Sequence, residues 1–124
     1  MIRFAAGFCA ALFFAGAALA ETPFERGRYL VNAVLNCGNC HTPKGPDAAK
    51  LLSGGTRFDL PAYNVVAPNL TPDRETGLGR WSDADIKKAL TDGVRPNGVR
   101  LASIMPSAFY GILSNDDLNA IVAI

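Results

Sequence analysis

Apolar residues between positions 22 and 37 recur at intervals of three and four, the spacing that places side chains on one face of an α-helix. Thr22 is a suitable N-cap, Pro23 fits the first helical position, and Glu25 stands three residues after the cap. These features predict a helix over residues 23–36 whose buried stripe ends at a cysteine. The stripe consists of Tyr29, Leu30, Ala33, Val34 and Cys37.

Gly27 lies inside this predicted helix, where glycine costs about 1 kcal/mol relative to alanine. A cost of this size is tolerated where a side chain would obstruct packing. We therefore expect a second helix to cross closely at Gly27.

Two further helices are indicated by their capping residues. Ser82 and Asp85 form a start signal after Trp81, and Gly93 is a stop signal. The inward residues of this helix are expected to be Ile86, Ala89 and Leu90. Ser114 opens the last helix, with Leu118, Ile121 and Val122 inward. The sequence ends at Ile124, only about three turns later, which indicates that the natural helix continues further.

Residues 42–80 show neither a helical nor a strand pattern and are rich in proline and glycine. A loop of this length without secondary structure is unusual in a compact domain. We expect it to wrap around another body that provides a packing surface.

The first 20 residues contain one basic residue, Arg3, then an apolar run and the ending Ala18-Leu19-Ala20. This pattern predicts a secretory signal peptide in residues 1–20, cleaved after Ala20, and a single domain over residues 21–124. Cys9 would leave with the signal. The alternative is a retained membrane anchor, because the apolar run approaches the length of a spanning helix. The expected location is the periplasm.

Charge then limits the partners. Without Arg3, the remaining basic residues balance the 11 acidic ones. A binder of nucleic acid or of a membrane surface needs clustered excess basic charge. We therefore expect no nucleic-acid partner, and membrane contact only through a partner or the retained segment.

The stretch LNCGNCHTPKG contains Cys37, Cys40 and His41, and residues 21–124 have no other cysteine or histidine. A zinc site needs four ligands, which this set does not supply. A thioredoxin-like dithiol belongs at a strand-to-helix junction, and no strand pattern precedes this motif. In an exported chain, Cys-x-x-Cys-His is the attachment signature of c-type haem. Two thiols about one turn apart can add to the two porphyrin vinyl groups, which holds His41 beneath the iron.

Met105 is the only methionine after the initiator and is the candidate for the sixth iron position. Pro106 follows it and favours an extended conformation at Met105. The alternative is a methionine that fills a gap in the core. Ligation by His41 and Met105 would close the iron to small molecules and favour electron transfer.

The chain resembles the class I c-type cytochromes, and among them the cytochrome subunits of periplasmic alcohol and sugar dehydrogenases. The segments that carry the resemblance are RGRYLVNAVLNCGNCHTPKG, APNLTPDRETGLGRWSDADIKKAL, GVRPNGVRL and MPSAFYGILSNDDLNAIVA. The resemblance implies an all-α class I cytochrome c fold, with three or more helices and long loops around one covalent haem c. Ile124 departs from the family, which usually has tyrosine there, and relatives continue further or into more haem domains.

The resemblance also implies roles for individual residues. Cys37 and Cys40 match the thioether cysteines, His41 the proximal iron ligand and Met105 the distal one. A proline carbonyl should accept the second ring proton of His41, and Pro68 is a better match for it than Pro43. Leu118, Ile121 and Val122 match the partners of the crossing glycine, Gly27.

Trp81 is a candidate hydrogen-bond donor to a haem propionate, and simple core packing is its alternative role. Further candidates for the propionates are Arg57, Tyr63 and Arg80.

These features predict a non-enzymatic carrier of single electrons on a His/Met-ligated haem. Its transient redox partners would be a dehydrogenase or quinol-linked donor and an oxidase or another cytochrome. The alternatives are a haem enzyme of the peroxidase type and a gas-binding module, both with an open sixth iron site. A structural subunit whose haem only supports folding is a third alternative.

Overall fold

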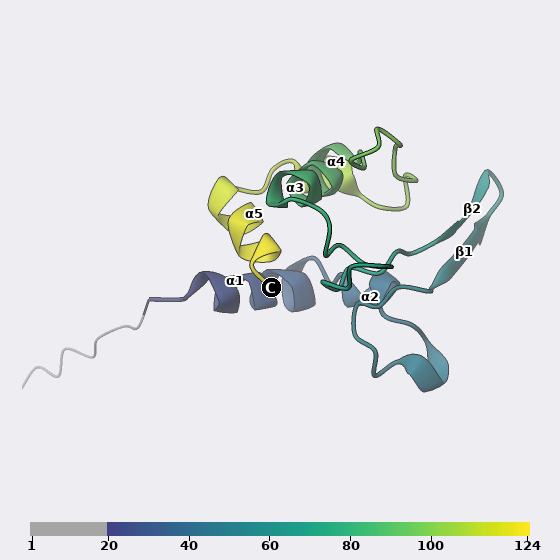
Figure 1. Ribbon diagram of the computed structural model, residues 1–124, viewed down its shortest axis with the longest axis horizontal. Coiled ribbons are helices and arrows are strands. Elements are labelled where there is room, and N and C mark those ends of the chain that lie inside the picture. Colours follow the sequence, from purple (N-terminus) through teal and green to yellow (C-terminus); the bar gives the residue numbers. More distant parts are fainter. Residues whose placement is uncertain (1–19) are drawn as a thin grey trace, which may run out of the picture.

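The computed structural model of the chain describes residues 20–124. Its α-helices are α1 (Pro23–Tyr29), α2 (Gly38–His41), α3 (Asp83–Asp92), α4 (Ser107–Tyr110) and α5 (Asn115–Val122). A π-helical turn, Leu30–Val34, continues α1, and a 3₁₀ turn, Gly45–Asp47, follows α2. The strands β1 (Arg57–Leu60) and β2 (Tyr63–Val66) form an antiparallel pair. Figure 1 shows α5 lying across α1, with α3 and α4 beyond it and the strand pair projecting at the far end. The predicted signal peptide lies outside the described residues, apart from Ala20.

The three predicted helix starts are present. The Thr22 hydroxyl accepts a hydrogen bond from the backbone N–H of Glu25, whose carboxylate accepts one from the backbone N–H of Thr22. Ser82 and Asp85 form the same reciprocal capping box at α3. Ser114 caps α5 by accepting from the backbone N–H of Asp117. Each cap provides partners for N–H groups that a helix start leaves free, and local sequence therefore determined these starts.

The first helix runs over residues 23–34, two residues short of its predicted end, and it is not a uniform α-helix. In its π-helical turn, the backbone N–H of Leu35 donates to the carbonyl of Leu30 at 2.8 Å. Asn36 then adopts φ 49°, which stops the helix just before Cys37. A π turn inserts one extra residue and shifts the faces of the residues around it.

The predicted inward stripe of this helix is therefore wrong in part. Tyr29 is 52% exposed and Val34 is 51% exposed, whereas Leu30 and Val31 are buried. Ala33 is exposed as well. The sequence pattern assumed a constant number of residues per turn, and the π turn over Leu30–Val34 breaks that assumption for Ala33 and Val34.

The crossing of α1 and α5 confirms the expectation for Gly27. A Cβ atom on Gly27 would lie 2.0 Å from the carbonyl oxygen of Ala120, a contact that only glycine avoids. It would also lie 2.8 Å from Cγ2 of Ile124. Beside the crossing, Arg26 Nε donates to Asp117 Oδ1 at 2.7 Å. Of the predicted partners on α5, Leu118 is buried and Ile121 and Val122 are partly buried.

The expectation of an all-α fold with a structureless stretch at residues 42–80 is incomplete. Arg57 pairs with Val66 and Leu60 with Tyr63, so residues 57–66 form a β-hairpin. The hairpin has only four residues in each strand and both strands are largely exposed. Because such a short pair has too little buried alternation to stand out, its pattern was not visible in the sequence.

The core within residues 20–124 is small. Its apolar members are Leu30, Val31, Ala67, Ala89, Leu90, Leu118 and Ala120. The predicted inward residues Ala89 and Leu90 of α3 are among them, and Ile86 is partly buried. In the same part of the chain, no helix combines the length and apolar character needed to cross a membrane.

Candidate haem-binding site

The Cys-x-x-Cys-His motif forms a single helical turn. Cys37 is the N-cap of α2, and the backbone N–H of His41 donates to the carbonyl of Cys37 at 2.9 Å. Both cysteines are partly buried, and neither forms a disulfide. Positions three apart in a helix lie on the same side. The motif therefore presents its two thiols together.

The His41 ring has a fixed partner. Nδ1 lies 2.8 Å from the carbonyl oxygen of Pro68, and only 7% of the residue is exposed. A carbonyl can only accept, so Nδ1 carries the proton and Nε2 keeps its lone pair for another partner. Burial lowers the pKa of His41, and the Pro68 carbonyl acts in the opposite direction. Of the two prolines that the sequence left open, Pro68 makes the contact.

The backbone of His41 also has a hydrogen-bond partner from a distant part of the chain. The backbone N–H of Gly54 donates to the carbonyl of His41 at 2.7 Å. Gly54 has φ 76°, and a Cβ atom there would lie 2.6 Å from the carbonyl carbon of Pro68. Gly54 thus contacts both His41 and the residue that binds its ring. Its positive φ and its close contact both require glycine.

Thr42 joins the next segment to this arrangement. Its hydroxyl accepts from the backbone N–H of Leu52 at 3.0 Å, and its carbonyl accepts from the Thr56 hydroxyl at 3.1 Å. The backbone N–H of Leu70 donates to the carbonyl of Leu52 at 2.8 Å. The loop on either side of the hairpin is therefore packed against α2 through hydrogen bonds.

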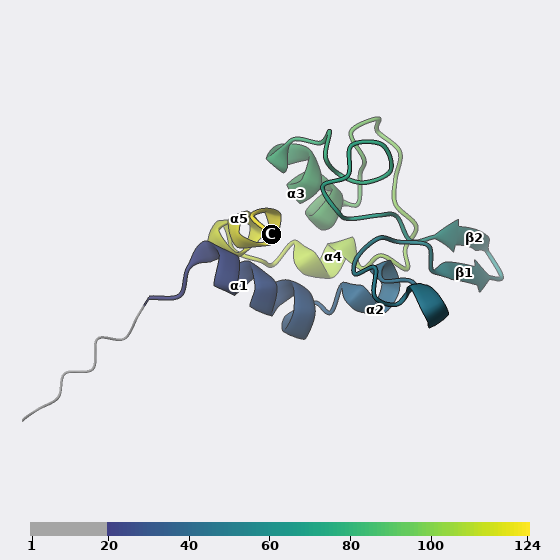
Figure 2. The ribbon, with the colours of Figure 1, turned by 60° about the horizontal axis from the view of Figure 1, so that its bottom comes forward.

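The environment of the Cys37 thiol differs from that of the attacking thiol in a redox dithiol. Burial raises the pKa of Cys37, and the neighbouring Cys40 acts in the same direction. Thioredoxin-like motifs instead lower the pKa of the attacking thiol to obtain the thiolate. The two cysteines also contribute to a raised pKa of Tyr110, after its burial, which places the end of α4 near the motif. In Figure 2, α4 lies between α5 and α2.

Met105 lies in the turn before α4. Its backbone N–H donates to the carbonyl of Ala102 at 2.9 Å, and its own carbonyl accepts from Ser107 at 2.8 Å. The residue is partly buried and borders a cleft of about 250 Å³ with Gly93, Leu101 and Phe109. Met105 and His41 lie on separate segments, and α4 connects the Met105 turn to the region of the two cysteines.

Comparison with known proteins decides the family. The cytochrome c family profile matches residues 24–123. The chain belongs to the cytochrome c family. As a member of it, the chain binds haem c covalently.

Individual relatives are cytochrome subunits of dehydrogenases. The chain is 36% identical over 99 residues to the gluconate 2-dehydrogenase cytochrome c subunit of Pantoea cypripedii, covering 80% of this chain and 22% of the relative. It is 35% identical to the fructose dehydrogenase cytochrome subunit of Gluconobacter japonicus, covering 80% of this chain and 20% of the relative. A diheme cytochrome c-type protein of Cereibacter sphaeroides is 34% identical, with 80% and 33% covered. The chain thus spans about a fifth to a third of the length of these relatives.

The residues of this cytochrome have the chemistry needed to hold a covalent haem. The thiols of Cys37 and Cys40 are free and belong to one helical turn, and His41 uses one ring nitrogen for Pro68 and has the other available. Met105 is partly buried and borders a different cleft, which none of the motif residues lines. A thioether sulfur and an imidazole nitrogen are typical axial ligands of cytochrome c iron.

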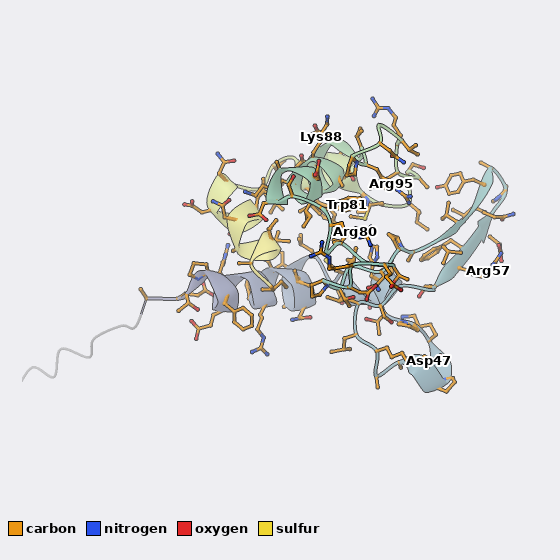
Figure 3. All side chains as sticks on the ribbon, viewed as in Figure 1. Asp47, Arg57, Arg80, Trp81, Lys88 and Arg95 are labelled. Atoms are coloured by element: carbon orange, nitrogen blue, oxygen red, sulfur yellow. The ribbon has the colours of Figure 1, made fainter. Side chains whose placement is uncertain are left out.

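The residues predicted to contact the haem propionates lie in different parts of the molecule. In the view of Figure 3, Arg80 and Trp81 lie in the middle of the picture, whereas Arg57 lies out on the hairpin. Arg80 is exposed. Trp81 is partly buried, and its indole N–H has no protein hydrogen-bond partner within residues 20–124. The Tyr63 hydroxyl lies 3.0 Å from that of Ser103. Sequence reasoning missed Gly54, Tyr110 and Ser103. Of these three, only Gly54 could have been singled out from the sequence, because it is one of two adjacent glycines in a loop.

Proposed function

We propose that this chain is a monohaem class I cytochrome c that carries one electron at a time. Cys37 and Cys40 form the two thioether bonds, His41 is the proximal iron ligand and Met105 the distal one. When bound, the haem supplies a reversible one-electron couple. The observation that carries the proposal is the hydrogen bond from His41 Nδ1 to the Pro68 carbonyl, because it leaves Nε2 as the coordinating atom.

The protein's own part is to hold the two axial side chains. Gly54 and Pro68 fix His41 at its carbonyl and its ring. The Met105 turn delivers a neutral, polarisable sulfur, which favours the reduced state and raises the reduction potential. If His41 and Met105 both held the iron, no position would be open to oxygen or peroxide, and the chain would act as a carrier rather than as a peroxidase or a gas-binding module.

We place the partners among dehydrogenases and other cytochromes, because the relatives are cytochrome subunits of gluconate, fructose and alcohol dehydrogenases. The basic side chains labelled in Figure 3 do not form one group: Arg57 lies on the hairpin, and Lys88 and Arg95 lie in another part of the molecule. This distribution supports a small and transient contact without strong electrostatic steering. Trp81, which is partly buried, is our candidate for a propionate contact.

The protein is exported in this proposal, with residues 1–20 as the signal and residues 21–124 as the haem domain in the periplasm. Outside the cytosol, cysteines usually form disulfides. Cys37 and Cys40 are free, which fits their use in attaching a haem instead.

The proposal is tested with the protein produced in cells that attach c-type haem. The purified chain should keep its pigment on a denaturing gel, and Cys37→Ser with Cys40→Ser should lose it. In the oxidised protein, Met105→Ala should abolish the weak far-red band of iron–methionine bonding and permit rapid carbon monoxide binding after reduction. A wild-type protein without that band, or one that binds carbon monoxide as readily as Met105→Ala, would show an open site and contradict the carrier function.

A further inference from the structure

The β-hairpin, residues 57–66, begins at the segment that holds His41. Beyond the last strand pair, the backbone N–H of Gly55 donates to the carbonyl of Ala67 at 2.9 Å, and Ala67 donates to Thr56 at 2.8 Å. These bonds continue the ladder to Ala67, which directly precedes Pro68. The base of the hairpin is therefore part of the structure around the His41 ring, and Figure 1 shows the strands extending from there.

The other end of the hairpin is bonded to the Met105 segment. Tyr63 is the first residue of β2, paired with Leu60 across the turn. Its hydroxyl lies 3.0 Å from the Ser103 hydroxyl, within hydrogen-bond distance, with either group as donor. The two residues are 40 positions apart in the chain. Tyr63 is partly buried, whereas Ser103 is exposed and the bond itself lies at the surface.

Ser103 lies in the same tight turn as Met105. The bond from the backbone N–H of Met105 to the carbonyl of Ala102 closes a tight turn that contains Ser103. A movement that takes Met105 out of its position therefore also takes Ser103 away from Tyr63. The Tyr63–Ser103 bond is present only while the turn is in its observed place.

We infer that the hairpin links the two axial sides of the site, and that Tyr63 and Ser103 are positioning residues that hold Met105 in place. This inference rests on the proposed function, in which Met105 ligates the iron. A bond that exists in only one of two states shifts the equilibrium toward that state. The Tyr63–Ser103 bond thus favours the state in which Met105 is bound.

The experiment uses the oxidised holoprotein and imidazole, which competes with Met105 for the sixth position. Imidazole binds only when Met105 has left, so its apparent affinity is proportional to the population of that state. Tyr63→Phe keeps the ring and removes the hydroxyl, and it should raise the apparent imidazole affinity about fivefold, the worth of one ordinary hydrogen bond. Ser103→Ala should have the same effect, and the double variant should exceed neither single one.

The matched control is Tyr29→Phe. Tyr29 is on α1, half exposed, and its hydroxyl has no protein hydrogen-bond partner in the described part of the chain. This variant should bind imidazole as the wild type does.

The outcomes separate the two proposals. Unchanged imidazole affinity in Tyr63→Phe and Ser103→Ala, or fully additive effects in the double variant, overturn the link. In a Met105→Ala background Tyr63→Phe should have no effect, and a persisting effect would also overturn it. If Met105→Ala binds imidazole no more tightly than the wild type, ligation by Met105 itself is refuted.

Discussion

The segment around His41 and the segment around Met105 are stabilised in different ways. His41 is bonded at its ring by Pro68 and at its carbonyl by Gly54, both distant in sequence. The backbone bonds of Met105 instead go to Ala102 and Ser107, within its own turn. Hydrogen bonds within a turn define the shape of that turn. They do not fix its position relative to the rest of the molecule, which depends on other contacts.

Few long-range hydrogen bonds position the Met105 turn. The Tyr63–Ser103 contact lies on one side of it, and on the other the Ser107 hydroxyl donates to the carbonyl of Ala89 at 3.2 Å. Because local opening requires only the contacts of the opening segment to break, the Met105 side should open at lower free energy than the His41 side. We expect ligand exchange at the iron to occur at Met105.

The largest effect is expected from Gly54→Ala, which acts on the His41 side. The new Cβ would lie 2.6 Å from the backbone of Pro68 and Asn69, at a φ of 76°. Left-handed strain and overpacking each cost about 1 to 2 kcal/mol, so unfolding should require about 3 kcal/mol less free energy. Urea unfolding followed by circular dichroism measures this change.

Gly45→Ala is the control for Gly54→Ala. Gly45 has φ 73°, and a Cβ atom there would have no neighbour within 4 Å. Gly45→Ala should therefore lower the free energy of unfolding only by the cost of the left-handed conformation, about 1 kcal/mol. Equal destabilisation by the two variants would mean that the contact of Gly54 with Pro68 is not tight.

An intermediate effect is expected from Ser107→Ala, which acts on the Met105 side. Ser107 is 6% exposed, and its hydroxyl bonds α4 to α3 through Ala89. Losing this bond should lower the free energy of unfolding by about 1 kcal/mol. It should also raise the apparent imidazole affinity of the oxidised protein, as Tyr63→Phe does, whereas Gly45→Ala should not. Destabilisation without a change in imidazole affinity would show that Ser107 does not position Met105.

The smallest effect is expected from Asp117→Asn, at the helix crossing and away from both segments. Arg26 lowers the pKa of Asp117 below its ordinary value of 3.8, so the carboxylate stabilises the folded state above that value. This contribution is lost as the pH falls through the lowered pKa. Asp117→Asn should therefore lower the urea midpoint modestly at neutral pH and have less effect in strong acid. An effect independent of pH would exclude the ion pair as its source, and the imidazole affinity should stay that of the wild type.

The sequence predicted well wherever neighbouring residues decide the outcome. The capping pairs of Thr22 and Ser82, the αL stop at Gly93 and the helical turn of the Cys-x-x-Cys-His motif each depend on residues within one turn. Gly27 was also interpretable, because a glycine inside a strong helix pattern has few roles other than close packing.

The sequence by itself determined the helix starts, the crossing glycine and the motif that marks the cytochrome c family, because each is encoded in a short window. Only the tertiary structure decided that Pro68 rather than Pro43 accepts from His41, and that Gly54 contacts both. It also decided that residues 57–66 form a hairpin and that Tyr63 bonds Ser103. The physical reason is that these contacts join residues far apart in the chain. Whether such residues meet depends on how the whole chain packs.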